Sequence, residues 1–590
     1  MELLIVLLER RGQLVSRNEI VERLWGKDVF IDYETGVNIA ISKVRQALRD
    51  SSDNPTFVET VVGKGYRFVA PVEVATPLIG RDDSSTNPEP QRTSRERRRT
   101  PPMLMALVAV TVIGVATTWA WLALRTPAHI TIGVLPFQNL TGDADREYLA
   151  DGLTEEAIAS FGQITPEQMR VVGRQAISAY KHSTKSAAEI GRELGADYLV
   201  ESSIRGDDAQ LRITSKLIRV ADQVQIWSES YDRQPSDVLG LQRELSTDIA
   251  AQIRLRLSPE RAAAIARRHT NRSDAYDLYL RGRYHGRQRT PVMVRRAIDY
   301  YVQAIALDPN YALAWAGVAD AYTSRPINSD SPTLEVRGPA LEAAEQAVRA
   351  EPDLAEAQTA LGRVKFWLDW DWPAAERMFR RAVTLDPGYA QAHLMLGHLL
   401  SQTGRHDEAV AALARARELD SRHPMHLAMS AQVAFQARDY RAALDYAQKT
   451  LELDRNFWIG HLELASAYDQ LGRDDLALEA VAKAADRSNG NFKTISFKGY
   501  VLARLGREDE ARHELRTLLA TSAVQYVPPA NIALVYAGLG ERDSAMEWLD
   551  RAVAARDVHL VFLTRDPRWD SYRGDPRFRA VLDRCGFGSQ

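Results

Sequence analysis

Four polar side chains recur along one face of a predicted helix near the N-terminus. They follow the spacing i, i+4, i+7, i+11, as the residues of one helix face do, and are Asn38, Ser42, Arg45 and Arg49. Amide, hydroxyl and guanidinium groups of this kind bond base edges and phosphate oxygens. The pattern predicts a helix surface that contacts nucleic acid.

This surface needs a helix that is held on its opposite face. Apolar residues repeat the same spacing one position earlier, at Val37, Ile41, Val44 and Leu48, which predicts one buried stripe. The preceding stretch "LVSRNEIVERLWG" predicts another helix, because Ser16 and Glu19 form a capping-box pair. Two β-rich runs then flank residues 63–65, Gly-Lys-Gly, which predicts a hairpin with a basic tip.

A helix, a polar-striped helix and a basic hairpin, in this order, resemble the OmpR/PhoB-type winged-helix DNA-binding domain. The matching stretches are "GQLVSRNEIVERLWG", "VNIAISKVRQALRD" and "NPTFVETVVGKGYRF". The resemblance implies a second helix in the major groove and a wing beside the minor groove. By position it implies groove or phosphate contacts from Thr35, Asn38, Ser42, Lys43 and Arg45, and wing contacts from Lys64 and Arg67.

Two features depart from that family. The family usually opens with a small sheet, whereas Met1 already lies within what would be the first helix, so either the start lies upstream or the sheet is lost. The family often has arginine where Val62 stands, and Lys64 is the expected substitute. The alternative interpretation is a winged helix that binds protein instead of DNA.

An uncharged segment, residues 103–124, lies well inside the chain. Its 22 residues would extend roughly 33 Å as a helix, enough to cross a bilayer core of about 30 Å. Several arginines precede it within residues 92–99, and Arg125 follows it, so the positive-inside bias places the N-terminal part in the cytoplasm. Residues 74–102 are polar and Pro-rich, which is typical of a disordered tether.

Residues 128–258 alternate strand and helix patterns. We expect strands in 129–142, 169–177 and 196–233, and helices in 148–162 and 237–257. The stretches "GVLPFQNLTGD", "YLADGLTEEAI", "IGRELGADYLVESSIR" and "IWSESYDR" resemble a TolB N-terminal-type domain, which implies an α/β module without catalysis. Asp151, Glu155 and Glu156 could serve acid–base chemistry, but a structural role on the helix is favoured.

From about residue 275 the chain repeats every 34 residues. Alanine recurs at 375, 409, 443, 477, 511 and 545, and glycine at 404, 472, 506 and 540, with Arg438 at the missing position. This period is typical of tetratricopeptide repeats, whose stacked helix pairs form a superhelix with a concave groove. We expect seven or eight units, a groove for a protein or peptide partner, and a cap formed by residues 562–587.

Several classes of chemistry find no support in the sequence. The single cysteine, Cys585, cannot form an internal disulfide and is expected to pack as a small apolar residue. Histidines 393, 398, 423 and 426 lack metal-site spacing and are expected in packing roles. No nucleotide loop or nucleophile elbow is present, so we expect neither an enzyme nor a cofactor.

The sequence therefore predicts a multidomain chain with a winged helix (α+β), one transmembrane helix, an α/β TolB-N-like domain and an all-α TPR superhelix. The predicted boundaries are 1–73, 74–102 (linker), 103–124 (span), 128–260 and 272–590. This order resembles the CadC and ToxR group of membrane-anchored one-component regulators.

That resemblance implies a single-pass protein of the bacterial inner membrane, with a cytoplasmic N-terminus and a periplasmic C-terminal region. It would bind promoter DNA, possess a receiving region for signals, and form a homodimer on DNA. The alternative is an envelope scaffold whose winged helix is vestigial or docks protein.

Overall fold

The computed structural model describes most of residues 2–20, single positions between 37 and 50, and residues 55–61, 65–70, 130–164, 169–207, 209–234, 241–253 and 269–588. The chain divides into two compact units, Met1–Thr111 and Val112–Gln590. In the described ranges no helix has the length and apolar character needed to span a bilayer. The predicted span and the predicted linker lie outside those ranges.

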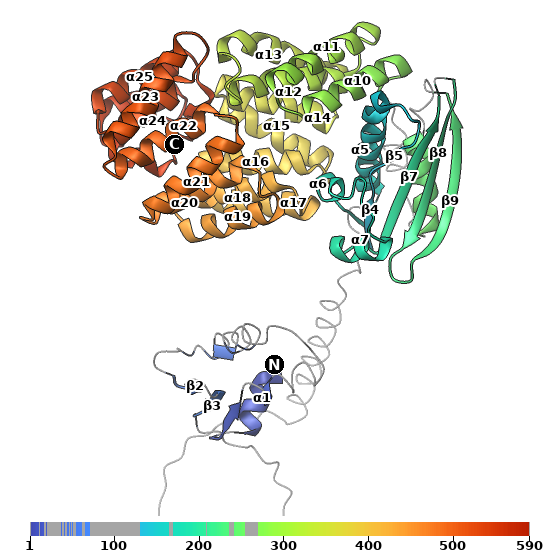
Figure 1. Ribbon diagram of the computed structural model, residues 1–590, viewed down its shortest axis with the longest axis horizontal. Coiled ribbons are helices and arrows are strands. Elements are labelled where there is room, and N and C mark those ends of the chain that lie inside the picture. Colours follow the sequence, from blue (N-terminus) through green and yellow to red (C-terminus); the bar gives the residue numbers. More distant parts are fainter. Residues whose placement is uncertain are drawn as a thin grey trace, which may run out of the picture. The chain divides into compact units, whose positions relative to one another are not determined.

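The N-terminal unit has a small antiparallel sheet beside helical segments (Figure 1). Its elements are α1 (Glu2–Glu9), β1 (Leu14–Ser16), β2 (Val58–Val61) and β3 (Gly65–Phe68), with sheet order β1-β3-β2. The predicted apolar stripe is confirmed, because Val37, Ile41 and Val44 are buried and Leu48 packs against the same core. That core also contains residues of α1 and of all three strands.

A helix cap and a hairpin stabilise the local structure of this unit. The capping box is confirmed: the Glu19 N–H donates to Ser16 Oγ at 3.2 Å, and the Ser16 N–H donates to a Glu19 carboxylate oxygen at 3.2 Å. The hairpin is confirmed by the β2–β3 register, in which Val61 lies opposite Gly65. A Cβ at Gly65 would lie 2.1 Å from the Val15 carbonyl oxygen, so glycine is required at this position, where β3 pairs with β1.

The second unit begins with an α/β domain built on a mixed sheet. The strands are β4 (Ile130–Val134), β5 (Gln138–Asn139), β6 (Met169–Val171), β7 (Tyr198–Gly206), β8 (Leu211–Arg219) and β9 (Val224–Arg233). The sheet order is β6-β4-β7-β8-β9, with β5 paired to β7. The β6, β4 and β7 strands run parallel, whereas β7, β8 and β9 form an antiparallel meander.

Helices lie against both faces of this sheet, since Leu199 and Val200, neighbours in β7 that point to opposite faces, pack against different helices. They are η1 (Ala144–Arg146), α5 (Glu147–Ile164), α6 (Arg174–Ser178), α7 (Ala187–Leu194) and α8 (Leu241–Gln252). The strand expected over 169–177 is wrong in its second half, because it ends at Val171 and α6 follows. Gly173 precedes α6, and Ala176 and Ile177 bury one side of this short helix.

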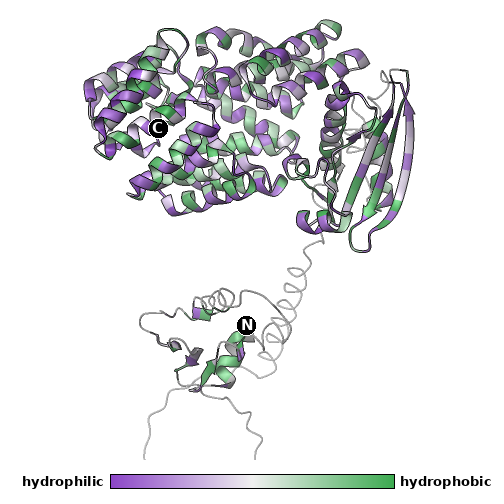
Figure 2. Cartoon of the chain, in the orientation of Figure 1, coloured by the Kyte–Doolittle hydropathy of each residue, from purple (hydrophilic) through white to green (hydrophobic). Residues whose placement is uncertain are grey.

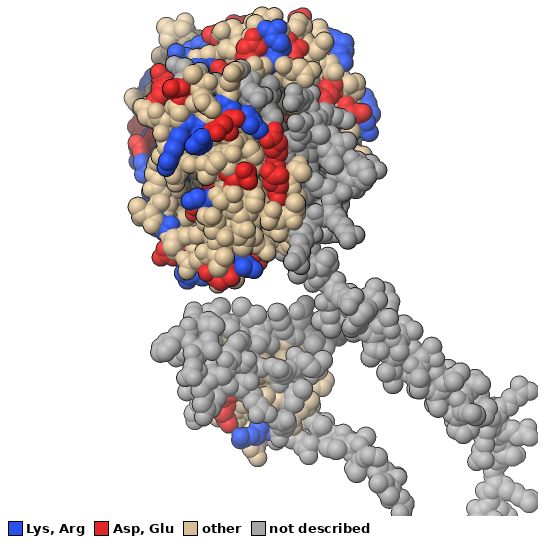
Figure 3. Space-filling view, turned by 90° about the vertical axis from the view of Figure 1, so that its right-hand side faces the viewer, with Lys and Arg blue, Asp and Glu red and all other residues tan. Residues whose placement is uncertain are grey.

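The face turned toward the viewer in Figure 3 carries acidic and basic side chains side by side. Pairs such as Arg212 Nε with Asp232 Oδ1, at 2.7 Å across β8 and β9, account for this mixture. The exposed face of β8 and β9 is therefore polar, and its paired charges leave no strong electrostatic field of either sign.

The rest of the unit is an array of paired helices. They are α10 (Ser273–Gly286), α11 (Pro291–Leu307), α12 (Ala312–Ile327), α13 (Thr333–Ala350), α14 (Ala355–Val364) continued by η3 (Lys365–Asp369), α15 (Trp372–Leu385), α16 (Ala390–Gln402), α17 (His406–Leu419), α18 (Pro424–Gln436), α19 (Tyr440–Leu453), α20 (Trp458–Gln470), α21 (Asp474–Arg487), α22 (Phe492–Arg504), α23 (Glu508–Ser522), α24 (Pro529–Gly538) and α25 (Arg542–Ala554). Successive first helices, such as α14, α16, α18 and α20, contact one another and form the inner layer.

The 34-residue pattern has a direct structural meaning. The six alanines at 375, 409, 443, 477, 511 and 545 are all 0% exposed, at the contact between the two helices of a pair. The glycines at 404, 472, 506 and 540 have φ between 68° and 81°, the left-handed region that ends the first helix. Arg438, at the missing position, adopts the same conformation with φ 67°. Figure 2 shows hydrophobic and hydrophilic residues mixed along these helices, as expected when each has one buried side.

The chain ends in a segment that we call the tail, residues 556–588. It contains η4 (Val558–Phe562), η5 (Pro567–Tyr572) and α26 (Pro576–Arg584). Its α26 packs on α25, as expected of a cap, but η4 contacts η3 and α12 near the start of the array. Figure 1 accordingly shows the C-terminus among the repeat helices.

Candidate nucleic-acid interface and repeat surfaces

Two of the predicted DNA-contacting residues, Arg45 and Arg67, lie in the described part of the N-terminal unit. The other six lie outside it: Thr35, Asn38, Ser42, Lys43, Arg49 and Lys64. Their contacts with DNA stay predictions.

Arg45 connects the predicted groove helix to the wing. Its Nη2 donates to the Val58 carbonyl oxygen at 2.9 Å and to Thr60 Oγ1 at 2.8 Å, both on β2. Two hydrogen bonds from one guanidinium nitrogen to two residues of β2 restrict the angle between helix and strand. Arg45 therefore has a positioning role within the unit, in addition to the phosphate contact predicted for it.

Arg67 lies on β3 directly opposite Glu59 on β2, and their side chains form a 3.7 Å ion pair. Both side chains are about two-fifths exposed, at 40% and 43%. Solvent screens a pair at this exposure, so it contributes little to stability and leaves the Arg67 guanidinium accessible on the wing.

Asp50 has a structural role that was not predicted from the sequence. Its carboxylate accepts bonds from the backbone N–H groups of Thr56, Phe57 and Val58 at 2.7, 3.1 and 2.7 Å. These bonds tie the end of the predicted groove helix to the first residue of β2. The available signal was an aspartate followed by Ser-Ser-Asp-Asn-Pro, a typical turn composition.

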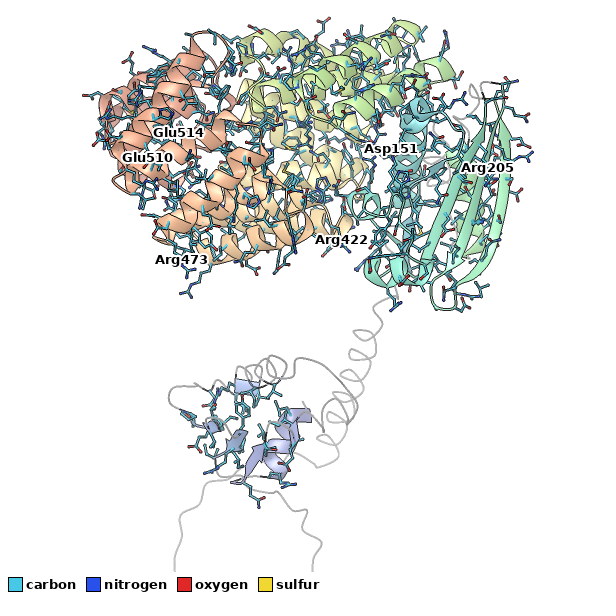
Figure 4. All side chains as sticks on the ribbon, viewed as in Figure 1. Asp151, Arg205, Arg422, Arg473, Glu510 and Glu514 are labelled. Carbon is cyan, nitrogen blue, oxygen red and sulfur yellow. The ribbon has the colours of Figure 1, made fainter. Side chains whose placement is uncertain are left out.

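The carboxylates of α5 form a network of ion pairs. Arg174 Nε lies 2.6 Å from Glu155 Oε1, and Lys181 Nζ lies 2.7 Å from Asp151 Oδ1. Figure 4 labels Asp151 on the side of α5 that faces the repeats. These contacts support the structural role that the sequence favoured over acid–base chemistry.

The network continues into the first repeat helix. Arg283 of α10 pairs with Glu155 and, at 2.8 Å, with Glu156, while Arg287 also pairs with Glu155. Glu155 is only 8% exposed. Burial lowers the pKa of Arg287 to about 10, because a desolvated guanidinium loses hydration. The α/β domain is thus joined to the repeats by buried charge pairs as well as by apolar packing of α5 on α10.

The four histidines have packing and capping contacts. His393 and His426 bond backbone carbonyl oxygens at 3.1 and 3.2 Å, and His423 accepts an N–H bond at the start of α18. His398 stacks on Phe562 of the tail with ring centroids 5.6 Å apart. Burial lowers the pKa of His398 and His423 to about 3 and that of His426 to about 4, so these rings are neutral at physiological pH.

The tail lies along the inner layer of the repeats, where a partner groove was expected. Trp372 of α15 stacks on Phe587 with centroids 4.5 Å apart, and its Nε1 donates to the Cys585 carbonyl oxygen at 3.1 Å. Arg556 Nε donates to the Leu368 carbonyl oxygen at 2.9 Å. Cys585 is 1% exposed, which confirms its packing role.

Further contacts fasten the tail to the fourth and fifth pairs. Thr564 Oγ1 donates to the Gln402 carbonyl oxygen at 3.1 Å. Arg438 donates to the Arg565 carbonyl oxygen at 2.6 Å and to Asp570 Oδ1 at 2.7 Å. Much of the inner surface is therefore occupied by the chain itself, and a partner bound there stays a prediction.

Known families match the N-terminal domain and the middle of the repeat array. The family described as "Transcriptional regulatory protein, C terminal" matches residues 1–68. Tetratricopeptide repeat families match residues 371–433 and 429–492. The chain thus contains an OmpR/PhoB-type DNA-binding domain and tetratricopeptide repeats, and neither family description names a catalytic activity.

Two curated relatives are named as transcriptional regulators. Transcriptional regulator HilA of Salmonella typhimurium is 22% identical over 424 residues, which is 71% of this chain and 65% of HilA. The cholera toxin homolog transcriptional activator of Vibrio parahaemolyticus is 35% identical over 88 residues, 15% of this chain and 30% of that protein. These similarities support the resemblance to CadC/ToxR-like regulators.

A Rhizobium meliloti protein named as an adenylate cyclase is 30% identical over 195 residues, 33% of each chain. The chain spans from about a third to two thirds of the length of these relatives.

Proposed function

We propose that this chain is a one-component transcriptional regulator that binds promoter DNA through its N-terminal unit. The observation that carries the proposal is the OmpR/PhoB-type domain at residues 1–68, whose predicted groove helix is fixed to the wing through Arg45 and Asp50. Asn38 and Ser42 would contact bases or phosphates in the major groove, and Lys64 and Arg67 would contact the backbone from the wing.

The proposal extends to the membrane. Residues 103–124 would form a single span that holds the DNA-binding unit in the cytoplasm and the second unit in the periplasm. The α/β domain, which we propose is TolB-N-like, and the repeats would receive a signal or a protein partner as one body. Two winged helices on adjacent half-sites would then bind as a homodimer.

Promoter binding is tested by chromatin pull-down of the tagged full-length chain, followed by sequencing. We expect sharp peaks with repeated half-sites, and loss of those peaks in Asn38→Ala and Lys64→Ala variants. Lys483→Ala is the matched control, because Lys483 is an exposed side chain of α21 whose ion pair is with its neighbour Glu479. A flat profile from the wild-type chain would refute the proposal and favour the scaffold alternative.

Topology is tested with a membrane-impermeant maleimide on intact cells with a permeabilised outer membrane. The thiol of Cys585 is buried, so we expect little background labelling from it. Ser228→Cys, at an exposed position of β9, supplies the labelling site in the second unit. Thr56→Cys, exposed in the N-terminal unit, is the matched control. We expect Ser228→Cys to label in intact cells and Thr56→Cys only after lysis; the reverse result would refute the orientation.

A further inference from the structure

A small polar cavity lies between the inner layer of the repeats and the tail. Its walls come from the first helices α18, α20, α22 and α24 and from the tail residues between His559 and Trp569. The cavity volume is about 60 Å³. Since one buried water needs roughly 10–15 Å³ by this measure, the space fits a molecule of about five heavy atoms.

Two buried amide groups in its wall have no hydrogen-bond partner among the described residues. They are Oε1 of Gln432, a side chain 9% exposed, and Nδ2 of Asn531, a side chain 4% exposed. Leaving such buried groups unpaired is unfavourable, because they have given up hydrogen bonds to water. One is an acceptor and the other a donor, so a ligand that satisfies both must itself carry a donor and an acceptor.

Two charged groups in the same wall are also unpaired. Glu463 is 6% exposed, and within the described chain its carboxylate forms no ion pair or hydrogen bond. The Lys493 ammonium lies over the Phe562 ring at 4.9 Å and pairs with no carboxylate described here. Arg568 and Asp566, by contrast, form a bidentate pair with each other and need no further partner.

The repeat register shows that these charges depart from the packing pattern. Met429, 34 residues earlier, takes the position of Glu463, and Ile459 and Val527, 34 residues to either side, take that of Lys493. Apolar residues thus satisfy the fold at these positions in neighbouring units. A carboxylate and an ammonium that replace them lose hydration, and the attraction between the two compensates only in part, because neither forms an ion pair or hydrogen bond with a described residue.

The pKa shifts of Glu463 and Lys493 agree with two buried charges that lack close partners. Burial raises the pKa of Glu463 to about 7, although Lys493 and Arg568 oppose the shift. Burial also lowers the pKa of Lys493, although Glu463 opposes it. A bound cation beside Glu463 and a bound anion beside Lys493 would restore the charged form of each.

We propose that this cavity binds a small zwitterion of the α-amino acid class, with its ammonium group at Glu463 and its carboxylate at Lys493. Gln432 would accept from the ammonium group and Asn531 would donate to the carboxylate. The volume limits the side chain of the ligand to one of about alanine size. This inference goes beyond the proposed function and rests on the cavity alone.

The test is isothermal titration calorimetry of the full-length chain in detergent micelles. The probes are glycine, L-alanine, sodium acetate, methylammonium chloride and L-tryptophan. We expect saturable binding of glycine and L-alanine, binding of acetate and methylammonium at least tenfold weaker, and no binding of L-tryptophan, whose ring exceeds the cavity.

Variants decide whether the cavity is responsible. Glu463→Met introduces the residue found one repeat earlier, and Lys493→Met introduces an apolar residue like those one repeat to either side; each should weaken glycine binding at least tenfold. Glu463→Gln, of nearly the same shape, gives the same comparison if the methionine variant unfolds. Glu479→Gln, on the exposed side of α21, is the matched control and should bind like the wild type.

Three results would overturn the proposal. Acetate binding as tight as glycine binding, lost only in Lys493→Met, would define an anion site. Glycine binding that survives both methionine variants would place the ligand elsewhere. Absence of binding by every probe would mean that water alone fills the cavity.

Discussion

Replacing Arg438 with glycine should release the tail while leaving the repeats intact. Arg438 is the residue that breaks the glycine pattern, and its guanidinium bonds the Arg565 carbonyl oxygen and Asp570. The backbone there is left-handed, with φ 67°. A glycine adopts this conformation without strain, so Arg438→Gly removes only the side-chain contacts with the tail.

The magnitude follows from the two contacts. The bond to the carbonyl oxygen is charge-assisted and contributes about 1.5 kcal/mol. The pair with Asp570 joins side chains that are 36% and 47% exposed, so it adds about 0.5 kcal/mol. The sum of about 2 kcal/mol corresponds to a roughly 30-fold larger population with the tail released, because 1.36 kcal/mol is a factor of ten.

Hydrogen exchange read by mass spectrometry measures that population. When reclosing of the tail is faster than chemical exchange, the exchange rate of residues 558–588 rises in proportion to the released fraction. We expect a roughly 30-fold rise in the tail and little change in α18 and α20. Asp570→Asn should give a rise of only about twofold.

Gly506→Ala is the matched control for the backbone. Gly506 has φ 72°, and a Cβ there would meet no atom within 4 Å, so this change costs about 1 kcal/mol of repeat stability without touching the tail. Tail exchange that stays at the wild-type rate in Arg438→Gly would refute our account of why arginine occupies this position.

Three further predictions concern other parts of the second unit. Glu155→Gln should lower the free energy of unfolding by about 2 kcal/mol in urea titration, because Arg287 loses its ion-pair partner and Arg283 keeps one of its two; an unchanged midpoint would contradict this. Burial raises the pKa of Cys585 to about 12, so its thiol should react with Ellman's reagent only as fast as the chain unfolds, and rapid native labelling would be inconsistent with the tail's position. Burial raises the folded-state pKa of Asp420 to about 7, so the folded state binds more protons than the unfolded state and stability should fall from about pH 4 to pH 7. Asp420→Asn should therefore raise the melting temperature at pH 8 and not at pH 4, whereas an equal effect at both would contradict the titration.

The sequence predicted the features that follow from local rules. The stripe of Val37, Ile41 and Val44 is buried as its spacing required, and Ser16 and Glu19 form their capping box. Both depend on residues within a few positions of each other, where helix geometry fixes which side chains meet. The short helix α6 was missed because five residues without a long periodic pattern do not distinguish a helix from a strand.

The candidate DNA interface was predictable in residue type but not in role. Arg45 was expected on the groove face, and only the fold shows that it bonds β2 13 and 15 residues later in the chain. The junction carboxylate Glu155 bonds Arg283, 128 residues away. No periodic signal links such positions, because their contact depends on how separate elements pack.

The 34-residue period alone determined the repeats, since each helix pair needs a small buried residue and a left-handed turn at fixed places. What only the tertiary structure decided is the path of the tail. Phe587 stacks on Trp372 across more than two hundred residues of sequence, and tail residues around Phe562 lie on the inner surface of the array, which no single repeat possesses. That surface and the polar cavity in it exist only after the helix pairs have stacked, because stacking brings residues from four separate repeats to one place.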